Sequence, residues 1–123
     1  MVGAGDPFMM ITIYHNPRCL KSRETLKLLE ARGLKPVIVD YLKTPPTPAE
    51  LKSILKTLRL KPEALLRKSE QLYAELGLKD RKLDDDALIA LMVENPILIE
   101  RPIVVAGGKA AIGRPPEKIL EIL

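Results

Sequence analysis

The sequence predicts an α/β protein built on a mixed β-sheet, with a strand–helix–strand half first and a hairpin–helix half last. Three observations predict this class. Ile11 and Ile13 alternate with a polar residue, apolar residues fill 37–39, and a helical pattern lies between them, which is the order of a parallel βαβ unit. Adjacent glycines, Gly107-Gly108, separate two short apolar runs, as in a β-hairpin. Between the two halves, over 44–96, apolar residues recur at helical spacing.

The first half carries the only cysteine of the chain at the start of a predicted helix. The strand Ile11–His15 alternates with a period of two, and Asn16-Pro17 ends it. The helical pattern begins at Cys19, and Gly33 ends it. We predict that 37–39 forms a second buried strand, parallel to the first.

The middle segment has clear helix boundaries. Thr47-Pro48-Ala49-Glu50 matches a capping box with proline at the first helical position. Shorter helices are predicted over 62–66 and 70–76, and Asp84 begins a longer one that Asn95-Pro96 ends. We therefore expect this segment to be helical throughout.

The tail combines a hairpin over 101–112 with a final helix within 113–123. This element order is that of a thioredoxin-like domain with a helical insertion at 44–96. We predict one domain over 1–123, in which residues 1–9 are disordered or belong to a tag.

Composition narrows the class of protein. Of 123 residues, 46% are apolar and 29% are charged, which is typical of a globular domain. The net charge of +4 is spread along the chain, and only four aromatic residues are available for base stacking, so we expect no nucleic-acid partner. A single cysteine suits a reducing compartment, and no apolar run reaches the roughly 20 residues of a membrane span. We expect a cytoplasmic monomer without a membrane partner.

Cys19 is the candidate nucleophile. Unpaired N–H groups and the helix dipole at a helix start favour a thiolate, and Arg18, Lys21 and Arg23 add positive charge nearby. The alternative is that Cys19 is a small buried apolar residue. Ser22 stands where the second cysteine of a C-x-x-C motif would be, so no internal disulfide can form.

Two polar residues beside Cys19 are further candidates. The Ser22 hydroxyl could hydrogen-bond the thiolate or cap the helix. His15 could stabilise the thiolate or orient a neighbour, or it could be a packed histidine satisfied by the backbone. One histidine and one cysteine cannot supply a structural zinc site, so we expect no metal.

Three arginines, Arg67, Arg101 and Arg114, lie at element boundaries beside apolar residues or proline. Converging guanidinium groups would bind a tetrahedral oxyanion, whereas the alternative for each is simple surface exposure. Proline follows Arg101 at the start of a strand, so we expect a cis peptide bond there that brings Arg101 against the thiol turn.

Six segments, in this order, resemble the signatures of the glutaredoxin-coupled arsenate reductase family and cover the chain from about residue 11 to its end. The segments are Tyr14-His15-Asn16-Pro17-Arg18-Cys19 with Ser22-Arg23, Tyr41-Leu42 with Pro45-Pro46, Leu65-Leu66-Arg67, Asn95-Pro96-Ile97-Leu98-Ile99, Arg101-Pro102-Ile103-Val104-Val105 and Gly113-Arg114-Pro115. The resemblance implies a thioredoxin-like fold and arsenic detoxification by reduction of arsenate to arsenite. It further implies that Cys19 is the nucleophile, that His15 and Ser22 support its thiolate, and that Arg67, Arg101 and Arg114 bind the oxyanion.

The same resemblance implies no bound cofactor. Because the chain has one thiol, an external thiol must complete the reduction; the resemblance names glutathione as co-substrate and glutaredoxin as the partner that restores Cys19. Residues 18–22 are bulkier and more basic than the corresponding residues of arsenate-resistance members. In this respect the chain resembles a housekeeping subgroup of the family more closely. Two alternatives stay open, a thiol-dependent reductase of another substrate and an RNA-polymerase-binding regulator of the same fold.

Overall fold

The computed structural model describes residues 10–123 and divides the chain into two compact units. The first, here called the sheet unit, comprises Met1–Thr44 and Arg101–Leu123; the second, the helical unit, is Pro45–Glu100. Of the helical insertion expected over 44–96, residues 45–96 fall in the second unit, which continues to Glu100. The expectation for residues 1–9 lies outside the described residues, and the single domain over 1–123 stays a prediction.

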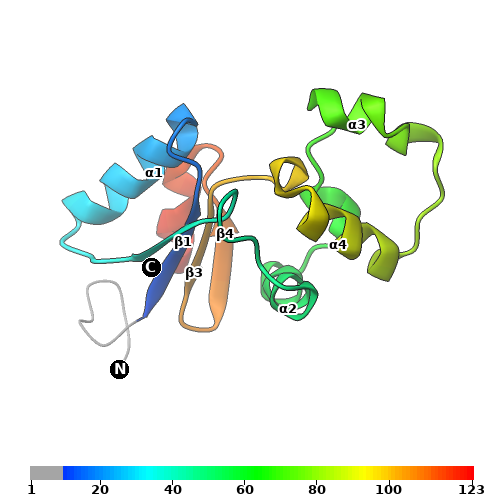
Figure 1. The fold of residues 1–123 in the computed structure, drawn as a ribbon. Helices are drawn as coiled ribbons and strands as arrows, with labels where there is room; N and C mark the ends of the chain where they lie inside the picture. Colours follow the sequence, from blue (N-terminus) through cyan, green and yellow to red (C-terminus); the bar gives the residue numbers. More distant parts are fainter. Residues whose placement is uncertain (1–9) are drawn as a thin grey trace. The chain divides into compact units, whose positions relative to one another are not determined.

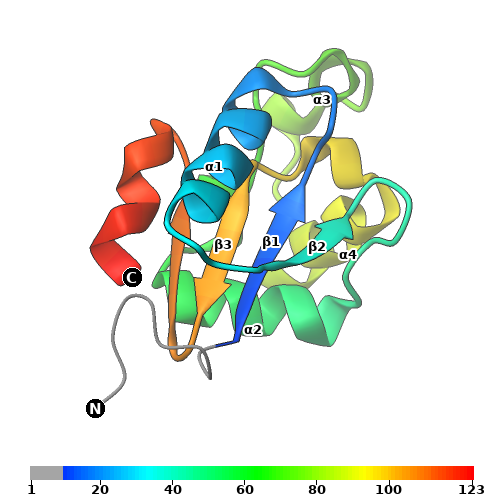
Figure 2. The ribbon, with the colours of Figure 1, turned by 90° about the vertical axis from the view of Figure 1, so that its left-hand side faces the viewer.

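The sheet unit contains a mixed four-stranded sheet in the order β2-β1-β3-β4 (Figure 2). The strands are β1 (Ile11–His15), β2 (Val37–Asp40), β3 (Ile103–Ala106) and β4 (Lys109–Ile112). β1 pairs parallel with β2 and antiparallel with β3, and β3 pairs antiparallel with β4. The predicted α/β class, with its βαβ half and its hairpin half, is confirmed.

Helix α1 (Leu20–Ala31) and the C-terminal 3₁₀ helix η4 (Pro116–Ile122) cover one face of this sheet (Figure 1). Between them lies the core of the unit, composed of buried apolar side chains from both halves of the sequence: Ile11, Ile13, Leu29, Leu34, Val104, Ala106 and Ile119. Cys19 lies directly before α1, after the turn that follows β1.

The C-terminus of α1 ends as predicted. Gly33 adopts a left-handed φ of +74°, its N–H donates to the carbonyl of Glu30 (2.9 Å), and the N–H of Leu34 donates to the carbonyl of Leu29 (3.2 Å). This is a Schellman motif, which satisfies the last carbonyls of the helix. It turns the chain back toward the sheet.

The prediction that 37–39 forms a buried strand is wrong. β2 lies at the edge of the sheet, and the side chains of Val37 and Ile38 are 52% and 51% exposed. A run of consecutive β-branched residues predicts a strand but does not reveal whether that strand has neighbours on both sides. The parallel pairing with β1 was predicted correctly.

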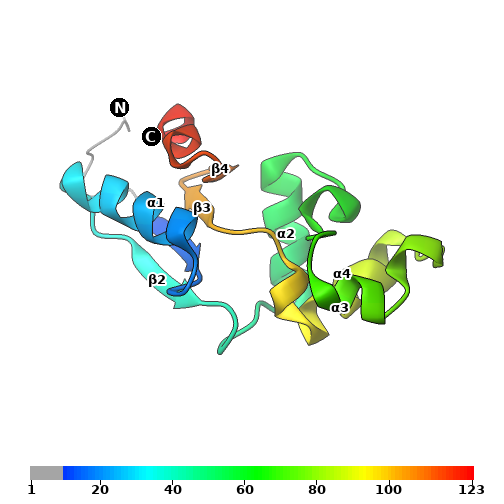
Figure 3. The same cartoon turned by 90° about the horizontal axis from the view of Figure 1, so that it is seen from above.

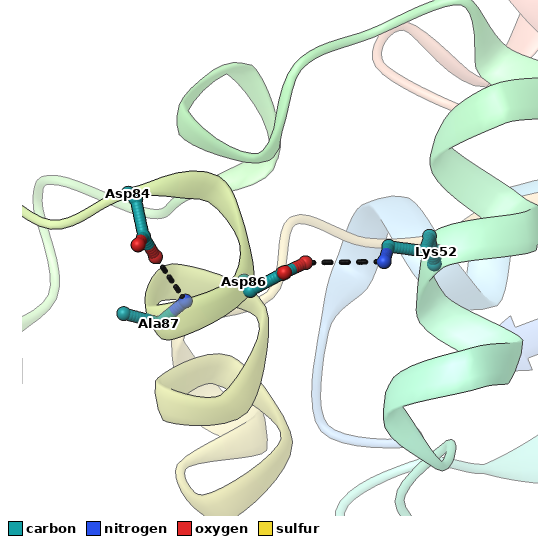
Figure 4. A network of polar contacts seen from close by, with 4 residues as sticks. All are labelled: Lys52, Asp84, Asp86 and Ala87. Atoms are coloured by element: carbon teal, nitrogen blue, oxygen red, sulfur yellow. Dashed lines mark hydrogen bonds and ion pairs between the residues drawn. The ribbon is translucent and has the colours of Figure 1, made fainter.

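The helical unit contains α2 (Pro48–Leu58), α3 (Gln71–Glu75) and α4 (Asp85–Glu94). Two short 3₁₀ helices, Pro62–Leu65 and Leu78–Asp80, lie between them, and a third, Pro96–Leu98, follows α4. The capping box is confirmed, because Thr47 and Glu50 exchange two hydrogen bonds of 3.1 Å. The N-cap of α4 is Asp84, which accepts from the N–H of Ala87 at 2.8 Å (Figure 4).

Helices α2 and α4 lie side by side, as Figure 3 shows. An ion pair of 3.1 Å joins Lys52 on α2 to Asp86 on α4 (Figure 4). Both side chains are exposed, so this pair stabilises the fold by less than about 1 kcal/mol. The stability of this helix pair therefore comes mainly from buried apolar side chains.

None of the helices within residues 10–123 has the length and apolarity of a membrane span.

Among the glycines that the structure describes, Gly113 is the one whose position leaves no room for a Cβ atom. A Cβ atom at this position would lie 2.5 Å from Oγ1 of Thr25 and 2.9 Å from Cγ of Pro102. The N–H of Gly113 also donates to the carbonyl of Pro102 at 2.9 Å, so the segment cannot move away without losing this bond.

Replacing Gly113 by alanine is therefore expected to lower the free energy of unfolding by about 1–3 kcal/mol, the usual cost of overpacking. Urea denaturation measures this change. Gly108→Ala is the matched control, because its Cβ would meet no atom within 4 Å and its φ is not left-handed. Equal stability of the two variants would contradict the close packing at Gly113.

Candidate active site

Cys19 lies at the end of a tight turn that links β1 to α1. The N–H of Cys19 donates to the carbonyl of Asn16, and the N–H of Arg18 donates to Oδ1 of the same asparagine, both at 3.0 Å. Cys19 is the N-cap residue of α1 and has extended backbone angles. The half-buried thiol is thus placed at the start of the helix, where the sequence predicts it.

The surroundings of the sulfur favour its ionised form. Burial raises the pKa of Cys19. Three neighbours lower it by more than burial raises it: the backbone N–H of Ser22, the charge and hydrogen bond of the Arg101 guanidinium, and the backbone N–H of Lys21. The net result is a pKa below that of an ordinary thiol. Because the thiolate is the nucleophilic form, this arrangement can support attack on an electrophile.

Arg101 is the predicted arginine that contacts Cys19. The strands explain why: Ile103 on β3 pairs with Tyr14 on β1, so the residues just before β3 lie beside the end of β1. The expected cis bond between Arg101 and Pro102 is confirmed.

The other two predicted arginines are not among the groups that act on the pKa of Cys19. Arg114 is exposed and follows Gly113, whose N–H bonds the carbonyl of Pro102, so its backbone lies near the Arg101 segment. Arg67 belongs to the helical unit, where its guanidinium pairs with Glu70 at 3.0 Å and donates to the carbonyl of Ile97 at 3.3 Å. The predicted oxyanion-binding roles of both residues stay predictions.

His15 and Ser22 form a buried pair behind the turn. Nδ1 of His15 lies 2.7 Å from the hydroxyl oxygen of Ser22, which also accepts from the N–H of Asn16 at 3.0 Å. The Ser22 hydroxyl thus contacts the turn and His15, whereas the backbone N–H of Ser22 acts on the sulfur. The partner of Nδ1 of His15 is therefore a side chain.

Comparison with known proteins gives the family. A family model described as the ArsC family matches residues 14–122. The chain belongs to the ArsC family. An arsenate reductase of Neisseria meningitidis serogroup A is 51% identical over 114 residues, which are 92% of this chain and 97% of the relative. The "uncharacterized protein YfgD" of Escherichia coli K12 is 56% identical over 114 residues, 92% and 96% of the two chains.

Solved structures agree with this assignment. The structure of an arsenate reductase from Vibrio cholerae aligns with a TM-score of 0.90 at 55% identity and covers 94% of this chain and 98% of its own. A putative arsenate reductase from Yersinia pestis gives a TM-score of 0.87, also at 55% identity, over 90% and 98% of the two chains. The resemblance to arsenate reductases seen in the sequence, and the thioredoxin-like fold that it implies, are confirmed.

Sequence reasoning missed two residues that shape the site of this ArsC family member. Asn16 was interpreted only as part of a strand-breaking pair, yet its side chain and carbonyl both hold the turn. Asp40 ends β2 opposite His15 in the parallel register, and its charge acts on that imidazole. An asparagine directly after a strand is a known signal for a side-chain-stabilised turn; the position of Asp40 has no such local signal.

The imidazole of His15 is held neutral. Burial lowers the pKa of His15, and the charge of Arg23 acts in the same direction, while Asp40 opposes them. A neutral ring can exchange a hydrogen bond with the Ser22 hydroxyl without placing a positive charge in the core. In this family member, His15 thus contacts Ser22, whose hydroxyl in turn accepts from the turn that leads to Cys19.

This neutrality makes stability depend on pH. As pH falls through about 6.5, the unfolded chain binds a proton at His15 before the folded chain does, because the pKa of His15 is lowered in the folded chain. The free energy of unfolding of the wild type should therefore fall between pH 8 and pH 5.5, and less so in His15→Gln. Urea denaturation across this range tests the difference, since His15 is the only histidine. Parallel pH curves would contradict a neutral, buried imidazole.

Proposed function

We propose that this chain reduces arsenate to arsenite, with Cys19 as the nucleophile. The observation that carries the proposal is the Cys19 sulfur at the start of α1, held toward its ionised form by the Arg101 guanidinium and two backbone N–H groups. The same donors suit an oxyanion, because they supply positive charge and hydrogen bonds at one place. Relatives named arsenate reductases support this choice of substrate.

In the first proposed step, the Cys19 thiolate attacks the arsenic atom. A sulfur–arsenic bond forms, one arsenate oxygen leaves as water after taking up protons, and the oxidation state of arsenic does not change. Arg101 lies where it can offset the charge of the oxyanion. We propose that Arg67 and Arg114 bind the remaining oxygens, and that His15 and Ser22 keep the turn in place.

In the second proposed step, glutathione supplies the other sulfur. Its thiolate attacks the Cys19 sulfur, a disulfide forms, and the electron pair of the sulfur–arsenic bond reduces arsenic to arsenite. An external thiol is needed because the chain has one cysteine. Glutaredoxin would then attack the glutathione sulfur and release the Cys19 thiolate. No resident cofactor takes part in this scheme.

The direct test is arsenite formation by the purified protein with arsenate, glutathione and glutaredoxin. We expect turnover in the complete mixture and none when arsenate or glutathione is omitted. Without glutaredoxin, one equivalent of Cys19–glutathione adduct should accumulate, which mass spectrometry detects. No arsenite in the complete mixture would refute arsenate as substrate, and a glutathionylated peptide in its place then tests the broader reductase alternative.

A further inference from the structure

A cavity of about 400 Å³ lies in the sheet unit, where β1 and β2 end. Six residues line it: Asn16, Pro17, Arg18, Asp40, Leu42 and Lys43. Three of them form the turn that leads into Cys19, and the other three follow from the end of β2. The volume lies within the range of small-molecule sites.

The cavity wall combines two cations with one anion. Arg18 and Lys43 are exposed, so their charged groups are available to a ligand. Asp40 is half-buried, and one of its carboxylate oxygens accepts from the N–H of Leu42 at 3.2 Å, which fixes its direction. Pro17 and Leu42 add apolar surface. A matching ligand would carry two anionic groups, one cationic group and an uncharged middle.

Glutathione has this pattern, with two carboxylates and one ammonium group at neutral pH and its thiol-bearing cysteine between them. We propose that this cavity binds glutathione, with Arg18 and Lys43 pairing with its carboxylates and Asp40 with its ammonium group. The proposal rests on the proposed function for the identity of the external thiol. Since Arg18 lines the cavity and precedes Cys19 directly, a peptide bound here would lie against the turn that carries the acceptor sulfur.

Another cavity is a weaker candidate. It has a volume of about 140 Å³ and lies within the helical unit, where its lining includes Lys68, Lys79 and Arg81. Lys68 is already paired with Glu63 at 3.1 Å. No residue that lines it belongs to the turn that carries Cys19, so nothing links it to the thiol chemistry.

The first test measures binding of S-methylglutathione, which cannot react, to the full chain by calorimetry. Arg18→Glu combined with Lys43→Glu should weaken binding at least about tenfold, because both carboxylate partners reverse their charge. Lys27→Glu combined with Lys109→Glu is the matched control: it makes the same charge change at exposed positions outside the cavity and should bind like the wild type. No binding to the wild type, or equal loss in both variants, would overturn the proposal.

The role of Asp40 has its own test. N-acetylation of S-methylglutathione removes the ammonium charge and should weaken binding to the wild type. Asp40→Asn keeps the oxygen that accepts from Leu42 but removes the charge, so this variant should no longer distinguish the two ligands. A wild type that binds both ligands equally would overturn the assignment of Asp40.

The second test uses thiol–disulfide exchange, without arsenic. The Cys19 thiolate attacks glutathione disulfide, forms a Cys19–glutathione disulfide and releases one glutathione thiolate. The rate is divided by the rate with hydroxyethyl disulfide, a neutral reagent, so that changes in Cys19 ionisation cancel. This ratio should fall about tenfold in the Arg18 and Lys43 variant and stay constant in the control. An unchanged ratio would overturn the proposal.

These outcomes separate the cavity from the proposed function. A wild type that reduces arsenate but fails both tests refutes only the cavity. A wild type that passes both but forms no arsenite refutes the choice of arsenate and leaves the glutathione site. Thermal melting checks that the variants fold, and Arg18→Gln with Lys43→Gln repeats the tests if charge reversal disturbs the turn.

Discussion

Cys19→Ser is expected to lower arsenate turnover by at least about 10⁴-fold, to the rate without protein. A serine hydroxyl stays protonated at neutral pH and cannot form the disulfide that supplies the electrons. Arsenite formation with glutathione and glutaredoxin measures the loss. Intact mass should also show no glutathione adduct, since the chain has no other cysteine.

The variant carries its own folding control. Cys19 is the N-cap of α1 and its side chain makes no capping hydrogen bond, whereas serine is among the best N-cap residues. Cys19→Ser should therefore be at least as stable as the wild type in urea denaturation. Loss of activity in a protein of full stability would assign the chemistry to the sulfur. Measurable turnover by Cys19→Ser would remove Cys19 as nucleophile.

Arg101→Gln is expected to raise the pKa of the Cys19 thiol, because it removes a positive charge that acts on the sulfur. Alkylation of the variant by iodoacetamide should be slower than that of the wild type at pH 7. The two rates should converge at high pH, where Cys19 is ionised in both proteins. The midpoint of the pH–rate curve measures this shift. The value of kcat/KM for arsenate should fall about 10²–10³-fold, as for the loss of one oxyanion donor.

Arg114→Gln is the control for this effect. It removes the same charge from an exposed arginine that is not among the groups acting on the Cys19 pKa. Its alkylation midpoint should match that of the wild type, whereas its KM for arsenate should rise if Arg114 binds the oxyanion. Equal midpoints for wild type and Arg101→Gln would show that Arg101 does not activate the thiol.

Features that depend on neighbouring residues could be predicted from the sequence. Strand alternation, the glycine pair of the hairpin, the capping box at Thr47 and the helix end at Gly33 all act within a few residues, and each is present in the structure. The position of Cys19 at a helix start is of the same kind. These local signals, taken in order, were also sufficient to predict the mixed sheet.

Features that depend on distant residues were decided by the tertiary structure. The three arginines looked alike in the sequence. The pairing of β3 with β1 brings Arg101 to Cys19, although the two residues are 82 positions apart in the chain. The edge position of β2 exposed Val37 and Ile38, and its register placed Asp40 opposite His15.

The sequence by itself thus determined which elements form and where the thiol lies. Only the folded chain determined which charges surround that thiol and which partner the Ser22 hydroxyl takes. The reason is physical. Backbone propensities and caps act between residues close in sequence, whereas pKa shifts and side-chain contacts depend on distances across the sheet.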